Sequence, residues 1–457
     1  MYHRPSPQSQ SHHSDDLFRS RLDNLIDMRH PLVRLAQRIN WSALDVAWGA
    51  RAQPAGAGNP ALPVRLVAGL LYLKHMHNLS DEAVCAGWLE NPYWQYFCGE
   101  VWFQTDLPCD PSSLTRYRQR LGEAGLEELL ALTVETGKAM KAVSTRDLQR
   151  VVVDSTVQEK AIAYPTDSRL LGIARRKLVQ FARRQGLALR RSYEREGPAL
   201  RVQAGRFAHA RQMKRLRKTV KRQRTLVGAL LRDILRKLAA HTLTAPVQAA
   251  WDTLRQRIER LLTQKMKDKR KLYALHAPEV ECISKGKARQ PYEFGVKVGI
   301  AVTAKQGFIV GARSFPGNPY DGDTLHEQLE QAETLTGVKI QEVLVDLGYR
   351  GRDSENPGRT ILHRGKAKRL THRQRGWLKR RQSIEPIIGH LKSDCGLGRC
   401  SLKGSEGDAY HPIVCAAGYN LRFLLRWIAA FLWMFLEWLQ GAKVNEAEPK
   451  DAEWVPA

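Results

Sequence analysis

Residues 148–157 read Leu-Gln-Arg-Val-Val-Val-Asp-Ser-Thr-Val, and this stretch decides the fold class. A β-branched apolar run that ends in an acid is typical of a buried strand, and here the acid is Asp154. The pattern recurs at 343–346, Val-Leu-Val-Asp, where the acid is Asp346. Adjacent strands would place the two carboxylates side by side at the edge of a sheet. Such a pair repels unless it is protonated or bridged by a cation, and Mg²⁺ suits oxygen ligands of this kind.

The elements around these two strands predict a mixed sheet flanked by helices. The order is strand, helical block, two strands, helix, strand, short strand and helix, which indicates an α/β fold. Helical periodicity in the first third of the chain adds a helical N-terminal domain. The expected elements after the first strand are a hairpin over 292–303 and 307–315, a helix over 324–336, strands over 339–348 and 360–363, and a helix over 371–394.

Residues 110–122 predict a short helix with a polar and basic face. Asp110 is a capping residue and Pro111 suits the first helical position. The helix carries Arg116 and Arg120, and a helix of this kind can enter a DNA major groove. A solvated helix face is the alternative, and the sequence leaves both readings open.

The charge of the chain is strongly biased and unevenly distributed. The formal net charge is +27, which favours a polyanionic partner, nucleic acid first. Residues 171–240 contain 21 Lys and Arg against 3 acids. Apolar residues at helical spacing within this block and after Pro246 predict an inserted basic helical hairpin. The one-sided charge favours phosphate binding over a solvated face, with the expected contacts at Arg211, Lys214, Arg215, Arg217 and Lys218.

Membrane-spanning and secreted classes fit the sequence poorly. The most apolar stretch, 427–436, has ten residues, about half of the length that spans a bilayer, so we expect a core or interfacial helix. The seven cysteines are scattered and without a C-x-x-C pair, which favours a reducing cytoplasm. His390, Cys395 and Cys400 are equally spaced, but structural zinc uses tighter pairs and a fourth ligand. We therefore expect reduced, partly buried thiols there.

The helical segment 380–392 supplies a candidate third acid for the two aspartates. Arg381, Glu385 and Lys392 lie at i, i+4 and i+11, roughly on one face of a continuous helix. Pro386 removes a backbone donor, so the helix kinks or begins near Ser383. An acid and a base that project together can hold a metal and a phosphate. A surface salt bridge between Arg381 and Glu385 is the alternative.

Together these motifs resemble the DDE transposases of bacterial insertion sequences, in the insertion-sequence-five-like group. The resemblance rests on Asp154 and Asp346 in their strands and on the Arg381, Glu385 and Lys392 spacing. Leu378 stands where that group has a tyrosine. Further similar stretches are Gly317-Asn-Pro-Tyr-Asp-Gly322, Ala416-Ala-Gly-Tyr-Asn-Leu421 and the helical region from 78 to 120.

The resemblance implies an RNase H-like catalytic core and a transposase that cuts the ends of its element and joins the 3′ hydroxyls to target DNA. It implies two Mg²⁺ ions, for which Mn²⁺ can substitute. We expect Asp154 to bridge the ions, Asp346 and Glu385 each to hold one, and Arg381 and Lys392 to position phosphates. The expected partners are double-stranded DNA and a second copy of the chain, with no membrane. The alternatives are an RNase H-like nuclease without strand transfer and an inactive or domesticated DNA-binding protein.

The sequence predicts six segments. They are a disordered arm (1–16), a helical DNA-binding domain (17–147), an RNase H-like core (148–170 and 275–405), a basic helical insertion (171–274), a C-terminal helix packed on the core (406–441) and a disordered tail (442–457).

Overall fold

The computed structural model describes residues 20–49, 61–265, 268–269, 271–284 and 291–445, without the side chains of 367, 369 and 431–445. The described residues fall into two compact units. The first comprises 1–156, 297–400 and 406–457, and the second comprises 157–296 and 401–405. The predicted arm and most of the predicted tail lie outside the described residues. The predicted division of the first unit into a helical domain and a catalytic core stays a prediction.

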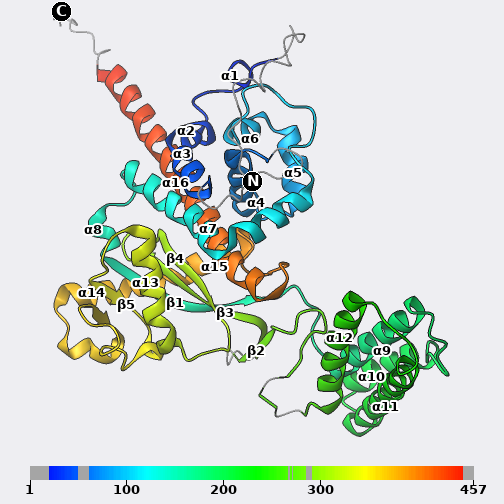
Figure 1. Ribbon diagram of the computed structural model, residues 1–457. Helices are drawn as coiled ribbons and strands as arrows, with labels where there is room; N and C mark the ends of the chain where they lie inside the picture. Colours follow the sequence, from blue (N-terminus) through cyan, green and yellow to red (C-terminus); the bar gives the residue numbers. More distant parts are fainter. Residues whose placement is uncertain (1–19, 50–60, 266–267, 270, 285–290, 446–457) are drawn as a thin grey trace, which may run out of the picture. The chain divides into compact units, whose positions relative to one another are not determined.

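The N-terminal part of the first unit is entirely helical (Figure 1). Caps read from the sequence are present: Ser80 Oγ accepts from the Ala83 N–H, and Asp110 Oδ1 accepts from the Ser112 N–H. The helix after Asp110 breaks at Gly122, whose φ of 64° favours glycine, and then resumes. The helices are α1 (Leu22–Leu25), α2 (Pro31–Arg38), α3 (Trp41–Gly49), α4 (Val64–Met76), α5 (Asp81–Glu90), α6 (Pro92–Phe97), α7 (Pro111–Ala139) and α8 (Thr145–Leu148).

A mixed six-stranded sheet forms the centre of the fold. The strand order is β2-β3-β1-β5-β6, with β4 paired to β3. β1 pairs with β5 and β5 with β6 in parallel, whereas β3 pairs with β2 and β4 antiparallel. The strands are β1 (Arg150–Glu159), β2 (Glu281–Ser284), β3 (Tyr292–Thr303), β4 (Ile309–Phe315), β5 (Glu342–Leu344) and β6 (Thr360–Leu362). The predicted hairpin is therefore confirmed, and the predicted strand over 339–348 is shorter than expected.

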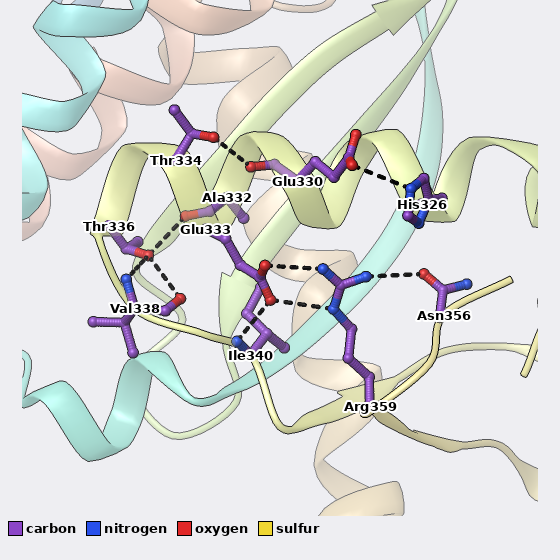
Figure 2. Close-up of polar contacts among 10 residues, drawn as sticks. All are labelled: His326, Glu330, Ala332, Glu333, Thr334, Thr336, Val338, Ile340, Asn356 and Arg359. Atoms are coloured by element: carbon purple, nitrogen blue, oxygen red, sulfur yellow. Dashed lines mark hydrogen bonds and ion pairs between the residues drawn. The ribbon is translucent and has the colours of Figure 1, made fainter.

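Helix α13 (Leu325–Thr336) packs against β4, and a polar network ties it to the chain that leads into β6 (Figure 2). Arg359 donates through Nε and Nη2 to the two carboxylate oxygens of Glu333, at 3.1 and 2.9 Å. Glu333 also accepts from the Ile340 N–H at the start of the β5 segment. Thr324-Leu-His-Glu327 has the sequence of a capping box, but Thr324 does not cap α13: it ends the 3₁₀ turn η2 (Asp321–Thr324), and its hydroxyl donates to the Asp321 carbonyl.

The helix expected over 371–394 is divided into three pieces. α14 (His372–Arg380) is followed by the 3₁₀ turn η5 (Arg381–Ser383) and by α15 (Ile384–Asp394). Pro386 occupies the first turn of α15, where its missing N–H costs no helical hydrogen bond. The predicted helix start near Ser383 is confirmed. Two further 3₁₀ turns, η3 (Leu347–Tyr349) and η4 (Arg364–Arg369), follow β5 and β6.

Helix α16 (Gly404–Asn445) runs through the core of the first unit. Among the described residues, its segment Gly404–Ala430 alone is long and apolar enough to cross a membrane, by length and composition. Buried positions make up 61% of its most apolar window, as in the core helix of a folded domain. Asn420 is fully buried and binds both backbone groups of Ile309 in β4, at 2.9 and 2.8 Å. The helix is thereby fixed to the edge strand of the sheet.

The second unit contains more helices than the predicted hairpin. Its described residues form four, α9 (Asp167–Arg184), α10 (Glu196–His209), α11 (Met213–Leu238) and α12 (Ala245–Thr263). Helix α11 packs mainly against α9 and α10 (Figure 1). The apolar faces of α9, α11 and α12 share one core, in which Trp251 of α12 stacks on Phe181 of α9 with ring centroids 4.5 Å apart. The expectation of two helices is corrected because α9 and α10 supply much of the surface that buries α11.

Candidate active site

The pairing of β1 with β5 brings Asp154 and Asp346 to one place on the sheet. The two strands are parallel, with Val151 opposite Val343 and Val152 opposite Leu344. Two residues further along each chain, this register sets Asp154 beside Asp346. The sequence placed both acids at strand ends, but β1 continues to Glu159, so Asp154 lies within its strand.

Asp154 is a largely buried carboxylate among other charges. Its Oδ1 accepts from the Ser155 N–H at 2.8 Å, and its Oδ2 lies 3.5 Å from Nη1 of Arg381. Burial raises the pKa of Asp154 to about 6 against the Ser155 hydrogen bond, and the charges of Asp346 and Asp321 add to the rise while Arg381 opposes it. A buried acid with acidic neighbours and a raised pKa is typical of a functional site.

Asp346 stands directly after β5, at the start of the turn η3. Its Oδ1 accepts from the Gly348 N–H at 2.7 Å. A Cβ at Gly348 would come within 2.9 Å of that same oxygen, so glycine is the residue that lets the turn wrap around the carboxylate. The Asp-Leu-Gly sequence therefore fixes the position of the Asp346 carboxylate.

Asp321 is a third carboxylate at the site, and its sequence context predicted no role for it. Its Oδ1 accepts from Ser155 Oγ at 2.8 Å and lies 2.9 Å from Nζ of Lys297, a buried lysine on β3. The available signal was a lysine inside an otherwise apolar strand, since a buried lysine needs a partner. The Asn-Pro-Tyr-Asp stretch contributed only to the resemblance.

Glu385 is exposed in the first turn of α15 and makes no hydrogen bond or ion pair with the described residues. It follows Arg381 by four residues, about one helical turn, and Arg381 is the residue that reaches Asp154. Lys392 lies half-buried in the last turn of α15. The structure thus brings Asp154, Asp346 and Arg381 together.

The remaining predicted DNA contacts are exposed. Arg116 donates to Ser112 Oγ one turn earlier, and Arg120 lies over the ring of Tyr117. Their neighbour Arg118 is buried and paired with Asp81, so it is unavailable for a groove. The five predicted contacts in the second unit are all exposed: Arg211, Lys214, Arg215, Arg217 and Lys218.

The acidic site suits a divalent cation. Asp154, Asp346 and Asp321 are oxygen donors whose charges act on a common neighbour: together with burial they hold the pKa of Tyr349 well above its ordinary value. A cation among these acids would relieve the repulsion between them. Lys297 and Arg381 balance part of the charge. Within the described residues, the one group of three potential ligand atoms that all lie within 4.8 Å of one another contains none of these acids.

The site combines two acids from neighbouring parallel strands with nearby cations, an arrangement suited to a divalent metal and an anionic substrate. Residues 262–421 match the family described as the transposase DDE domain, and residues 20–120 match the transposase domain DUF772. The chain is 50% identical, over 206 residues, to the uncharacterized protein ORF8 in the nfe locus of Rhizobium meliloti. The aligned region covers 45% of this chain and 99% of that protein. No solved structure matches.

The chain therefore belongs to the DDE transposase family, and the expected RNase H-like fold class with its helical N-terminal region is confirmed. The family acts on DNA and uses a divalent metal. Asp346 and Glu385 lie within the matched DDE segment, whereas Asp154 precedes it.

Proposed function

We propose that this transposase binds the ends of an insertion sequence, cuts them by Mg²⁺-dependent phosphodiester hydrolysis and joins the 3′ hydroxyls to target DNA. The single observation that supports the proposal best is the parallel pairing of β1 with β5, which brings Asp346 close enough to act on the charge of Asp154. Two carboxylates in this arrangement, next to the guanidinium of Arg381, provide metal ligands and a phosphate contact in one place.

Asp154, Asp346 and Glu385 would hold the ions. When bound, Mg²⁺ would supply Lewis-acid stabilisation of charge on the phosphate and lower the pKa of the attacking water. The chain's own groups do the positioning: the Ser155 and Gly348 N–H groups fix the two aspartates, and Arg381 would bind a non-bridging phosphate oxygen. Glu385 would complete the set of acids from α15.

The basic second unit is proposed to hold the flanking DNA. A pocket between α9, α10 and α11 is lined by several cations together with apolar side chains. Arg217, which the sequence predicted as a phosphate contact, is one of them, and the others are Arg169, Arg201, Lys221 and Arg224. The charge of such a surface favours the phosphate backbone without reading sequence.

The first part of α7, before the break at Gly122, is proposed to recognise the end of the element through the exposed Arg116 and Arg120. Cutting two ends in concert requires two active sites, so we propose a homodimer on DNA, acting in the cytoplasm. Mixing the protein with end DNA and measuring the mass of the complex tests the dimer. A complex that contains one chain at saturating protein would contradict it.

The test of the active site is Asp346→Asn in a Mg²⁺-dependent cleavage assay on DNA that spans the gene's borders. We expect cleavage to fall about a hundredfold or more, because losing a metal ligand removes several kcal/mol of transition-state stabilisation. DNA affinity should stay within about twofold, since phosphate contacts supply most of it. Asp353→Asn is the control, because Asp353 is an exposed acid on the same connection, paired with Lys366. Full cleavage by the Asp346 variant would refute the assignment.

A further inference from the structure

A buried trio of metal-binding side chains lies away from the acidic site. His75, His411 and Cys415 each offer one ligand atom, and these atoms all lie within 4.8 Å of one another. Nδ1 of His75 is 3.5 Å from Sγ of Cys415, and Nε2 of His411 is 3.7 Å from the same sulfur. The three side chains are 3%, 6% and 0% exposed.

The spacing of the trio matches what a tetrahedral zinc ion requires. Zinc bonds of about 2.0–2.1 Å to nitrogen and about 2.3 Å to sulfur place the two ligand atoms about 3.6 Å apart. Both nitrogen–sulfur distances fall within a few tenths of an ångström of this value. His411 and Cys415 are four residues apart on α16, so they project from one face of the helix.

Backbone groups hold both rings in place. The backbone of Cys395 hydrogen-bonds to His75, and His411 Nε2 donates to the Gly396 carbonyl at 2.9 Å. A metal bound through His411 Nε2 would replace this hydrogen bond. Burial favours the neutral imidazole, which is the form that binds a metal.

Helices α4 and α16 cross very closely at this point. A Cβ at Gly418 would lie 2.7 Å from the carbonyl carbon of His75, so only glycine permits the approach. His75 comes from α4, near the N-terminal end of the chain, and the other two ligands come from α16, 340 residues later for Cys415. A metal here would join the first and last parts of the first unit.

We propose that His75, His411 and Cys415 bind a Zn²⁺ ion, with the fourth position of the ion left to a water molecule or another small ligand. One thiolate and two neutral imidazoles would leave the bound ion with a single positive charge. The pattern of His390, Cys395 and Cys400 in the sequence is not the site, because His390 is exposed and bonded to Asp394.

The first test uses the untagged wild-type chain, purified under reducing conditions from zinc-supplemented medium and dialysed. We expect about one zinc per chain by elemental analysis. The protein is then stripped with a chelator and titrated with Co²⁺, which should produce a thiolate-to-cobalt charge-transfer band. Binding at the acidic site, or at histidines near the N-terminus, gives no such band because those ligands contain no sulfur.

Variants show which side chains give rise to the charge-transfer band. Cys415→Ser should abolish it, whereas Cys282→Ser, a control on β2, should leave it unchanged. Asp346→Asn should also leave it unchanged, which separates this site from the proposed catalytic one. A wild-type chain that retains no zinc, and whose stripped form shows no charge-transfer band with Co²⁺, would overturn the proposal. The trio would then be a hydrogen-bonded polar group in the core.

Discussion

Asp81 compensates two buried cations at once. Its carboxylate accepts from Nη1 and Nη2 of Arg118, at 2.9 and 2.5 Å, and from Nζ of Lys74, at 2.6 Å. Arg118 is 2% exposed, so its charge has little access to water. Burial alone would raise the pKa of Asp81, but Arg118 and Lys74 outweigh it and hold the pKa below its ordinary value. The acid therefore stays charged and keeps the two cations neutralised.

We predict that Asp81→Asn lowers the free energy of unfolding by about 3–5 kcal/mol, because it leaves a buried guanidinium without its counter-ion. Urea denaturation at neutral pH measures this. Asp23→Asn is the control, since Asp23 pairs with Arg21 on the surface and should matter little. A lowered carboxylate pKa contributes stability above pH about 3.8 that is lost as the pH falls through the folded-state value. The difference between wild type and Asp81→Asn should therefore shrink in that range, and a constant difference would contradict the assignment.

At the scale of elements, Asn420 explains why α16 is attached to the sheet. Its amide satisfies the N–H and C=O of Ile309 in β4 and also donates to Thr133 Oγ1 of α7, at 3.0 Å. We predict that Asn420→Leu costs about 2 kcal/mol or more, because buried backbone groups lose their partner. Asn24→Leu, at an exposed position on α1, is the control. Equal urea midpoints for wild type and Asn420→Leu would show that the contact is dispensable.

The basic helices of the second unit give a prediction about salt dependence. Neutralising Arg211, Lys214, Arg215, Arg217 and Lys218 together should weaken DNA binding. It should also flatten the plot of log affinity against log salt by about one unit for each lost phosphate contact. The same number of substitutions at exposed cations elsewhere, such as Lys305 and Lys339, is the control. An unchanged slope would show that these five side chains face solvent and do not contact DNA phosphates.

At the scale of the whole molecule, the sequence predicted the elements better than the contacts between them. Asp154 and Asp346 were readable because an acid after three apolar strand residues is a local pattern. Their proximity depends on which strands pair, and Asp321 joins them through contacts with Ser155 on β1 and Lys297 on β3, both distant in the sequence. The trio at His75 joins segments more than three hundred residues apart, so no local spacing announces it.

The helix count of the second unit was wrong for a related reason. Apolar residues also repeat at helical spacing in α9, at Leu170, Leu171, Ala174, Leu178 and Ala182. The prediction rested on the apolar repeats of α11 and α12 alone. Four helices are needed because a pair would leave the apolar face of α11 exposed to water.

The most direct test of the central claim is cleavage and strand joining with Mg²⁺ on DNA that spans the gene's own borders, wild type beside Glu385→Gln. Glu385 is the proposed ligand that makes no hydrogen bond or ion pair with the described residues, so its effect tests the complete site. We predict joined products with the wild type, and unchanged DNA binding without cleavage for the variant. Cleavage by the variant at the wild-type rate would contradict the three-acid site. Cleavage without joining by the wild type would make the protein a nuclease and not a strand-transfer enzyme.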